Sequence, residues 1–409
     1  MTIMPEIPFL PEPHALPGAS IKVVGVGGAG CNAINRMVEG GVSGVELLAM
    51  NTDQQCLGLS QAHVKLPLGP QSSRGLGAGG NAERGAVAAE ESREEILAAL
   101  RGADMVFIAA GMGGGTGTGA APVVASCARE LGALSVAVVC TPFQFEGRAK
   151  GDRALQGLEN LRSAADTVIV VANERLKSFV EARASLKDMF RAGDSVLIQG
   201  VRGIADLILR PGIMNSDFAD VEAILREGGE ALIGTGQGRG EEAVLDALKK
   251  ALACPLLERA QQGSARHVIV SVVANWDQQG FLGVETAMNF LQDHYHGVAE
   301  IKLGTVEAPE MEDRVHVTVL ASGFDGDEEL EQERRSSLNL EGSRPVVRTG
   351  PIYGEVPDHA PLAANPQMHT PTPTRLLPQA PTPSGEVVGA EDLHVPAIIR
   401  QAQGRLPIE

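Results

Sequence analysis

From Ile21 onward, short apolar runs alternate with segments of helical periodicity. The runs that we predict as buried strands are IKVVGV (21–26), VELLAMNTD (45–53), VKLPLG (64–69), MVFIAAG (105–111), SVAVVCTPF (135–143) and TVIVVAN (167–173). Segments with helical spacing lie between them, including one helix over about 82–101. Apolar strands separated by helices are typical of a mainly parallel sheet covered on both faces. The pattern predicts an α/β fold that binds its ligands at the carboxyl ends of the strands.

A long helical stretch follows, SLKDMFRAGDSVLIQGVRGIADLILRPG (185–212), and it ends at the helix-breaking pair Pro211-Gly212. Beyond it, apolar spacing predicts three helices and three strands. The helices are expected near 217–229, 240–254 and 281–294, and the strands over RHVIVSVVANW (266–276), AEIKLGTV (299–306) and RVHVTVLASG (314–323). We interpret these elements as a second, smaller α/β domain with a partly antiparallel sheet.

The two ends of the chain differ in composition from its middle. The N-terminal end is Pro-rich, and the segment 326–388 is charged and then rich in Pro, Thr and Ser. Such segments bury too little apolar surface to offset the entropy lost on ordering, so both are predicted to be disordered. Apolar residues return near the C-terminus, either as a partner-binding motif or as an end without function. The predicted organisation is an extension (1–19), a first α/β domain (20–185), a core helix (186–212), a second domain (213–325), a linker (326–388) and a C-terminal peptide (389–409).

Composition narrows the class of function. The formal net charge of −17 over 409 residues argues against nucleic acid as a partner. Five scattered cysteines without CxxC spacing indicate reduced thiols, not a disulfide framework or a zinc site. No apolar run approaches the length of a membrane span, so we expect a cytoplasmic protein without direct membrane insertion.

Three glycine-rich segments carry the strongest functional signal: GVGGAG (25–30), GLGAGG (75–80) and GGGTGTG (113–119). The first and third each join the end of a predicted strand to the start of a helix. Free N–H groups and the helix dipole favour phosphate there. The loops contain no lysine, so backbone amides and Mg²⁺ would have to hold the phosphates.

The glycine loops are compatible with two kinds of nucleotide site, a Rossmann dinucleotide fold and a polyphosphate site formed by several loops. GVGGAG matches the dinucleotide fingerprint, and Asp53 could be its ribose-binding acid, as in a nicotinamide-dependent oxidoreductase. A Rossmann fold needs only one glycine loop, however, and three loops are better explained by a polyphosphate surrounded on several sides. The P-loop signature is absent from the sequence.

Several side chains have both a functional and an ordinary interpretation. Glu146 could bind a ribose hydroxyl and Lys150 a phosphate, although solvated charges are more common. Phe190 and Asp194 share a helix face, where a ring could stack on a base and a carboxylate could accept the N1–H and N2–H₂ of guanine. The alternative for this pair is a core phenylalanine beside a surface acid.

The segment NSDFAD (215–220) opens a predicted helix. Asn215 or Ser216 as the N-cap, with acids in the first turn, is what a capped helix requires. They could also hold a water or cation for attack on a phosphate. Spacing alone leaves both interpretations open.

These motifs together closely resemble the FtsZ family of tubulin-like division GTPases. The matching segments are GVGGAGCNA, NTD, GLGAGGN, AGMGGGTGTGAAPVVA, PFQFEG, FRAGDSVL and RPGIMNSDFADV, in the family's order over roughly residues 20–325. The resemblance implies a GTP-binding domain, a tubulin-like fold and head-to-tail assembly into protofilaments at the midcell division site. It also implies that the second domain of one subunit completes the hydrolytic site of the next.

Residue by residue, the resemblance implies three groups. Asn215, Asp217 and Asp220 would act in trans, the two aspartates orienting and polarising the attacking water. The nucleotide, with Mg²⁺, would be held by Gly27, Gly28, Ala29, Gly30, Cys31, Asn32, Asn51, Gly77, Ala78, Gly79, Gly113, Gly114, Gly115, Thr116, Gly117, Thr118, Glu146, Lys150, Phe190 and Asp194. The tail would bind division proteins and membrane tethers through Leu393, Val395, Pro396, Ile398, Ile399 and Arg400.

The chain departs from the family at a few positions. Lys150 stands where the family usually has Arg, which keeps the charge but loses the planar fork. In the tail, His394 and Ile398 stand where Asp and Phe are typical, so the set of partners is expected to differ. Both aspartates of NSDFAD are present, which favours hydrolysis over the alternative of a GTP-binding filament scaffold with little turnover.

Overall fold

The computed structural model describes residues 18–179, 185–210, 212–214, 217–226, 228–257, 265–297 and 299–324. Its strands are β1 (Ile21–Val26), β2 (Glu46–Asn51), β3 (Val64–Pro67), β4 (Met105–Gly111), β5 (Leu134–Thr141), β6 (Thr167–Ala172), β7 (Gly229–Arg239), β8 (Ala265–Ala274), β9 (Glu300–Glu307) and β10 (Arg314–Phe324). Its α-helices are α1 (Gly27–Glu39), α2 (Gln54–Gly58), α3 (Ala82–Glu91), α4 (Arg93–Leu100), α5 (Thr116–Glu130), α6 (Arg148–Ala164), α7 (Leu186–Leu209), α8 (Phe218–Arg226), α9 (Ala243–Leu252) and α10 (Phe281–His294). The 3-10 turns are η1 (Gln144–Glu146), η2 (Asn173–Phe179) and η4 (Pro309–Met311).

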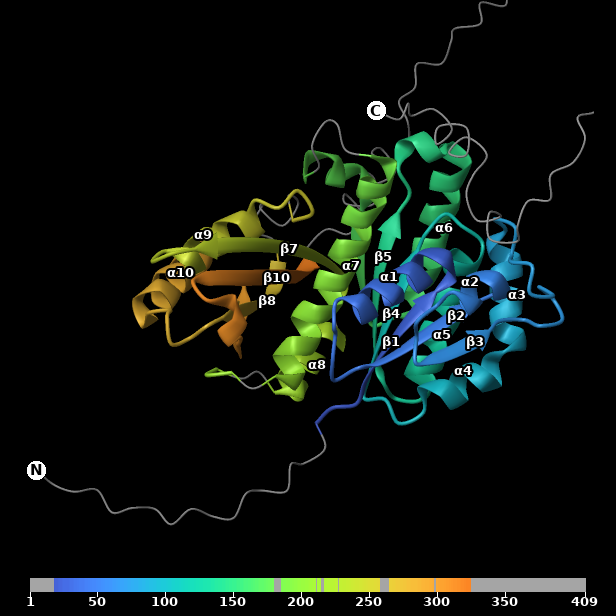
Figure 1. The fold of residues 1–409 in the computed structure, drawn as a ribbon, viewed down its shortest axis with the longest axis horizontal. Helices are drawn as coiled ribbons and strands as arrows, with labels where there is room; N and C mark the ends of the chain where they lie inside the picture. The colour runs from blue at the N-terminus through green and yellow to red at the C-terminus, as the bar shows by residue number, and fades with distance from the viewer. Residues whose placement is uncertain are drawn as a thin grey trace, which may run out of the picture. The chain divides into compact units, whose positions relative to one another are not determined.

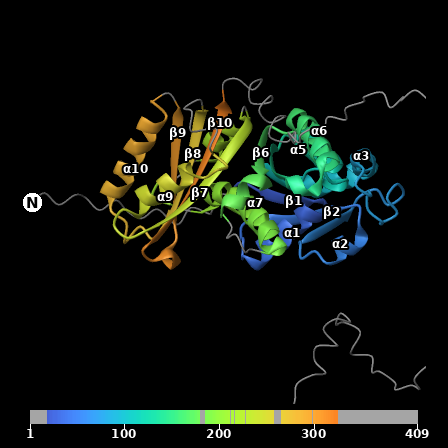
Figure 2. The ribbon, with the colours of Figure 1, turned by 90° about the horizontal axis from the view of Figure 1, so that it is seen from above.

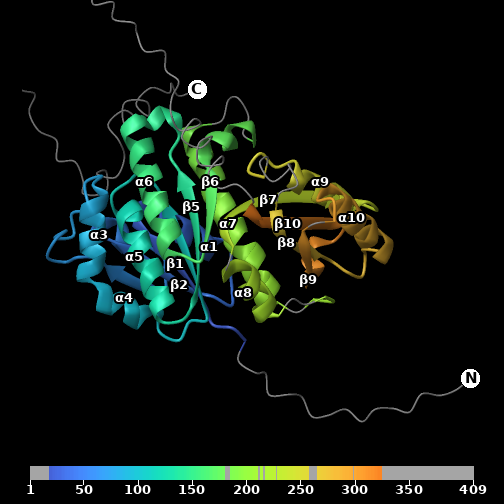
Figure 3. The ribbon, with the colours of Figure 1, turned by 180° about the vertical axis from the view of Figure 1, so that it is seen from behind.

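The first six strands form the parallel sheet that the sequence predicts, in the order β3-β2-β1-β4-β5-β6. Its core lies on both faces of the sheet. Helices α1, α2, α7 and α8 cover one face, and α3, α4, α5 and α6 cover the other. The opposite views of Figures 1 and 3 show α1 in front in one and α5 with α6 in front in the other. This burial on both sides explains why strands such as β4 are apolar throughout.

Helix α7 lies between the parallel sheet and the remaining strands (Figure 1). At Gly200 a Cβ would lie 3.4 Å both from a methyl group of Val138 on β5 and from one of Ile233 on β7. At Gly203 a Cβ would lie 2.8 Å from the Thr318 methyl group on β10. Small residues on α7 therefore let both layers approach the helix closely.

The last four strands extend the sheet in the order β7-β10-β8-β9 (Figure 2). The pairs β7–β10 and β10–β8 are antiparallel, and β8–β9 is parallel, so the predicted partly antiparallel pairing of these strands is confirmed. Strand β6 joins β7 in parallel over only Thr167–Ile169, which makes one ten-stranded sheet. Helices α9 and α10 pack on this second part and bury a separate core.

Strand β7 was not predicted, because its sequence GEALIGTGQGR is rich in glycine, which strands usually avoid. Its alternate residues Gly234, Gly236 and Gly238 face α9. A Cβ at each would overlap the carbonyl oxygens of Ala251, Ala247 and Ala243, respectively. Two strand residues rise about 6.6 Å and four helix residues about 6 Å, so the two rows of small residues stay in step. The glycines let a helix backbone lie directly on a strand.

The single helix expected over 82–101 is wrong, because the chain bends at Ser92 between α3 and α4. The Ser92 hydroxyl accepts a hydrogen bond from the Gly69 amide at 3.0 Å. The adjacent Glu91 carboxylate accepts the amides of Gln71 and Ser72 at 2.7 and 2.9 Å, which lowers its pKa. The side chains of both residues at the bend therefore hold the loop after β3, by accepting hydrogen bonds from its backbone amides.

Some predictions concern residues outside the described ranges. These are the disorder of the N-terminal extension, apart from its last residues, and of the linker at 326–388, the C-terminal peptide, and the position of Asn215. Among the helices that the structure describes, none is both long enough and apolar enough to cross a membrane.

Candidate functional site

A cleft opens at the carboxyl ends of β1, β4 and β5, where the strands give way to glycine loops. Many of the residues predicted to contact a nucleotide line it together. They are Gly28, Ala29, Gly114, Gly115, Thr116, Gly117, Glu146, Lys150, Phe190 and Asp194. The cleft therefore joins segments more than 160 positions apart in the sequence, since Ala29 and Asp194 both contribute to its wall.

Two helices begin at this cleft. Helix α1 starts at Gly27 and α5 at Thr116, and neither has a side chain that caps its first amides. The amides of a helix's first turn have no partner within the helix. Two such N-termini with their dipoles aimed at one cleft make a strong site for an anion.

The glycine loops pack against one another as well as facing the cleft. Gly27 has a φ of +72°, and a Cβ there would lie 2.8 Å from the Gly117 amide nitrogen. A Cβ at Gly115 would lie 2.8 Å from the Ala78 methyl group in the loop 75–80. Part of the glycine content is thus needed for the loops to interlock, before any ligand is considered.

Other glycines in the loops leave open space. Around Gly28 and Gly114 nothing lies within 4 Å of a Cβ position, and both residues line the cleft. At Gly30, in contrast, a Cβ would overlap the carbonyl oxygen of Ala109 on β4. Gly28 and Gly114 are therefore the positions where a missing side chain serves the cleft and not the packing of the protein.

Hydrogen bonds within the GGGTGTG loop and to neighbouring residues fix its shape. The Thr52 and Thr116 hydroxyl oxygens are 2.6 Å apart and buried, which ties the end of β2 to the start of α5. The Gly113 amide donates to the Thr118 hydroxyl oxygen at 2.9 Å, and Arg153 Nε donates to the Gly113 carbonyl at 3.1 Å. The loop is held in shape by its neighbours.

Glu146 and Lys150 lie in the cleft wall and form an ion pair with each other. The second Glu146 oxygen accepts the Phe143 amide at 2.9 Å, which fixes the η1 turn. The Glu146 side chain is mostly buried, and the Lys150 side chain is only partly so. Glu146 and Lys150 thus form an ordinary charge pair and also lie where a nucleotide-binding role was predicted for them.

Asp194 projects from α7 into the cleft and pairs with Arg36 of α1, its Oδ2 lying 3.0 Å from Nε. Burial raises the pKa of the Asp194 carboxyl to about 6, and the Arg36 cation opposes this rise. Phe190, one helical turn earlier, is 41% exposed and meets Phe143 edge-on at 5.5 Å between ring centroids. A hydrogen-bond acceptor and an exposed aromatic ring therefore lie on one wall of the cleft.

Asn173 also lines the cleft, although no motif in the sequence predicts a role for it. Its side chain is buried, and Oδ1 has no hydrogen-bond partner among the described residues. An unpaired buried polar atom is costly unless a ligand or water satisfies it. The only sequence signal was its place at the end of the predicted strand TVIVVAN, where an α/β sheet exposes its binding residues.

The other predicted contacts are not among the residues that line the cleft, namely Gly27, Gly30, Cys31, Asn32, Asn51, Gly77, Ala78, Gly79, Gly113 and Thr118. Cys31 and Asn51 are buried behind the first loop, where the Asn51 amide donates to the Cys31 sulfur at 3.8 Å. Burial raises the pKa of the Cys31 thiol to about 12. Asp53, the ribose-binding acid of the oxidoreductase alternative, instead caps α2 by accepting the Gln55 and Cys56 amides.

The segment with Asp217 and Asp220 lies at the other end of α7. Leu209 ends the helix 15 residues after Asp194, which is about 22 Å along its axis. Asp217 directly precedes α8, and its carboxylate accepts the Asp220 amide at 2.8 Å, as an N-cap does. Asp220 pairs with Lys302 on β9 at 3.1 Å. The N-cap is therefore Asp217, which directly precedes α8, and not the predicted Asn215 or Ser216.

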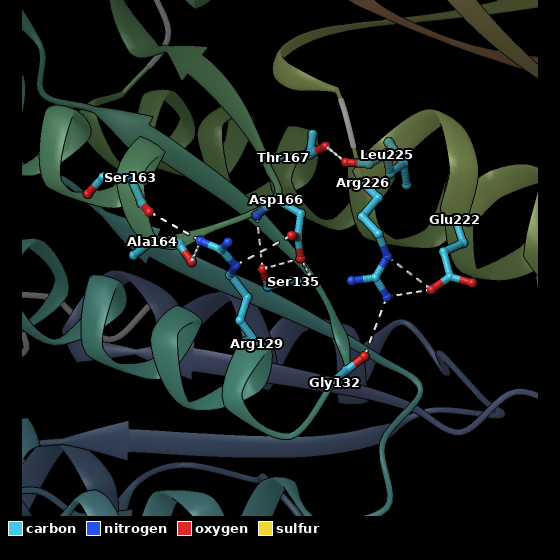
Figure 4. A network of polar contacts seen from close by, with 10 residues as sticks. All are labelled: Arg129, Gly132, Ser135, Ser163, Ala164, Asp166, Thr167, Glu222, Leu225 and Arg226. Carbon is cyan, nitrogen blue, oxygen red and sulfur yellow. Dashed lines mark hydrogen bonds and ion pairs between the residues drawn. The ribbon is translucent and has the colours of Figure 1, made fainter.

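Polar contacts bind α8 to the amino ends of β5 and β6 (Figure 4). The Thr167 hydroxyl donates to the Leu225 carbonyl, and Arg226 reaches the Gly132 carbonyl at 3.4 Å. Beside them the Asp166 carboxylate accepts from the Ser135 amide and hydroxyl at 2.8 and 2.7 Å. The cleft lies at the opposite, carboxyl ends of the same strands. In one subunit, the two aspartates thus lie near the amino ends of the parallel strands, and the cleft lies at their carboxyl ends.

The fold and the cleft define a GTPase of the tubulin type. Residues 20–181 match the family model "Tubulin/FtsZ family, GTPase domain", and residues 229–325 match "FtsZ family, C-terminal domain". Similar solved structures include an FtsZ dimer of M. jannaschii, 40% identical with a TM-score of 0.71, which covers 75% of this chain and 88% of that one. A mutant of M. jannaschii FtsZ aligns with the same identity and TM-score, over 75% and 92%.

A third similar structure is CetZ2 from Haloferax volcanii, described as a GTPγS-bound protofilament. It is 25% identical with a TM-score of 0.66, covering 78% of this chain and 98% of that one. The matched models and the identity to M. jannaschii FtsZ show that this chain belongs to the FtsZ family. The family hydrolyses GTP, so the nicotinamide-dependent oxidoreductase alternative is set aside.

Proposed function

We propose that this chain polymerises head to tail and that each hydrolytic site is shared by two subunits. GTP would lie in the cleft of one subunit, with its phosphates at the N-termini of α1 and α5 and its base between Phe190 and Asp194. Asp217 and Asp220 of the next subunit would orient and polarise the attacking water. The observation that carries the proposal is their separation, because one subunit cannot bring both halves together.

Exposed apolar side chains at both ends of α7 support this arrangement. Phe145, Leu186 and Phe190 near the cleft are 60%, 58% and 41% exposed. Ile213 and Met214, next to the aspartates, are 71% and 50% exposed. Two apolar surfaces at opposite ends of a subunit suit a heterologous interface that repeats without closing.

Complementation between two inactive variants tests the shared site. Gly28→Ala should place a methyl group where phosphate binds without disturbing the fold, since nothing lies within 4 Å of that Cβ. Asp220→Ala should bind GTP but lack the hydrolytic carboxylate. Each variant alone should hydrolyse GTP slowly, whereas their mixture should exceed the sum of the two, because Asp220 of the first can serve GTP on the second. A mixture no more active than its parts would refute a site formed in trans.

We also propose Mg²⁺ as the companion of the nucleotide. Among the described residues there is no cluster of three or more His, Cys, Asp or Glu that could hold a metal ion. Mg²⁺ commonly binds through substrate phosphates and water with few protein ligands, which fits a cleft rich in backbone amides. Turnover in the complementation assay should therefore require added Mg²⁺ and stop with a chelator.

In the cell, we propose a cytoplasmic polymer that forms the division ring at midcell. This rests on membership of the FtsZ family and on the proposed domain organisation, with residues 20–185 binding GTP and 213–325 activating it. Partners would be recruited through the C-terminal peptide 389–409. A fluorescent fusion should form a midcell ring, and removal of the peptide should abolish the ring while leaving GTPase activity intact.

A further inference from the structure

Strand β9 supports the segment between α7 and α8 by direct contact. The Met214 amide donates to the Thr305 hydroxyl at 2.7 Å, and the Thr305 amide donates to the Met214 carbonyl at 2.9 Å. At Gly212, any side chain would overlap the Thr305 carbonyl oxygen. Gly212 and Met214, which precede the two aspartates in the sequence, are therefore in contact with the edge strand β9.

A lysine on the same strand reaches the second aspartate. Lys302 Nζ lies 3.1 Å from Asp220 Oδ1 and 3.5 Å from Glu300 Oε1. Glu300 Oε2 in turn lies 3.6 Å from Nδ1 of His267. The Lys302 side chain is 34% exposed, and the pKa of its ammonium is raised, first by Asp220 and then by Glu300. Lys302 thus stays cationic with two carboxylates competing for it.

The two aspartates are consequently held in different ways. Asp217 uses one oxygen to cap α8, which fixes its carboxylate through the helix itself. Asp220 is the third residue of α8, and its carboxylate is 3.1 Å from a cation that comes from a distant strand. Removing Lys302 would leave Asp220 without this partner, whereas the cap on Asp217 would remain.

We propose that Lys302 is a positioning residue for GTP hydrolysis, which holds the Asp220 carboxylate in one orientation before the next subunit's nucleotide arrives. This rests on the shared site proposed above. The pair also places a positive charge beside a carboxylate that must approach a polyphosphate, which offsets part of their repulsion. Lys302 acts through Asp220 and need not touch the nucleotide.

Three substitutions separate this role from general support of the fold. Lys302→Met keeps most of the side chain's length without the charge, and turnover per polymerised subunit should fall about fivefold, the upper end for an exposed ion pair. Lys302→Arg should restore at least half of the wild-type turnover. Glu300→Gln removes the competing carboxylate, so its turnover should be no lower than wild type. GDP affinity of the free subunit should be unchanged in all three.

Mixing then assigns the effect to one side of the interface. Gly28→Ala mixed with Asp220→Ala is the reference. Adding Lys302→Met to the Gly28→Ala subunit, which donates the working Asp220, should slow the mixture about fivefold. Adding Lys302→Met to the Asp220→Ala subunit should change nothing.

The outcomes distinguish the two proposals. If the reference mixture fails to complement, the shared site itself is wrong. If it complements but Lys302→Met slows both arrangements equally, or neither, Lys302 does not position Asp220. Failure of Lys302→Arg to restore turnover, with unchanged thermal unfolding, would also overturn the inference.

Discussion

Lowering the pH from 7 to 5 should weaken guanine-nucleotide binding about tenfold through Asp194 alone. The carboxylate can accept both N1–H and N2–H₂ of guanine only when it is ionised. Burial raises the pKa of Asp194 to about 6, so the ionised fraction of the free subunit falls from about 90% at pH 7 to about 10% at pH 5. Arg36, 3.0 Å away, holds this pKa down, and Arg36→Ala should move the midpoint to higher pH.

The same pKa has a consequence for stability with a definite sign. Because the pKa of Asp194 is raised on folding, the folded state binds a proton more tightly than the unfolded chain between about pH 4 and pH 6. The contribution of this residue to the free energy of unfolding therefore increases as the pH falls through that window. Ligand binding and stability should respond to acid in opposite directions at this site.

The assay is titration of a fluorescent GDP analogue into dilute, unassembled protein at a series of pH values. The terminal phosphate of GDP itself titrates near pH 6, so the quantity to follow is the affinity of the wild type relative to Asp194→Asn. The amide does not ionise and keeps the size of the side chain. The ratio should fall about tenfold between pH 7 and pH 5.

Asp194→Asn also permits a test of base recognition. An amide can donate to the O2 of xanthine, which guanine lacks, so the variant should lose affinity for GDP and gain affinity for xanthosine diphosphate. Identical pH profiles for wild type and variant, together with an unchanged preference for GDP, would refute the assignment of Asp194 to the base.

Two further predictions concern stability. Asp217→Ala should lower the free energy of unfolding by about 1 kcal/mol because the helix cap is lost, whereas Asp217→Asn should preserve this free energy. Both variants should hydrolyse GTP more slowly, because neither has the carboxylate. If Asp217→Asn turned over GTP as fast as wild type, Asp217 would be a cap only. Gly236→Ala should destabilise by about 1–3 kcal/mol in denaturant unfolding, because its Cβ would overlap the Ala247 carbonyl. Gly58→Ala, in α2 with nothing within 4 Å of its Cβ, should be no less stable than wild type.

Structural features that depend on neighbouring residues could be predicted from the sequence, whereas those that depend on distant residues could not. Strand β4 was predicted at its observed limits because a strand buried on both faces must be apolar throughout. Strand β7 was missed because its glycines are required by close packing against the backbone of α9, and this tertiary contact is not visible in the local sequence. Likewise, GGGTGTG could be recognised from spacing, but Asn173 is a single residue after a strand. The contact between Asp220 and Lys302 spans 82 positions, and no local pattern predicts it.

The cleft and the aspartates lie at opposite ends of α7. This placement also determines how many complete hydrolytic sites a row of subunits can contain. A row joined as proposed would contain one fewer complete hydrolytic site than it has subunits. One terminal subunit would keep its cleft open to solvent, so it would exchange nucleotide without hydrolysing it. At the other terminus, the aspartates would have no nucleotide to act on. The direction of the chain within a single helix would thus make the two ends of the filament chemically different.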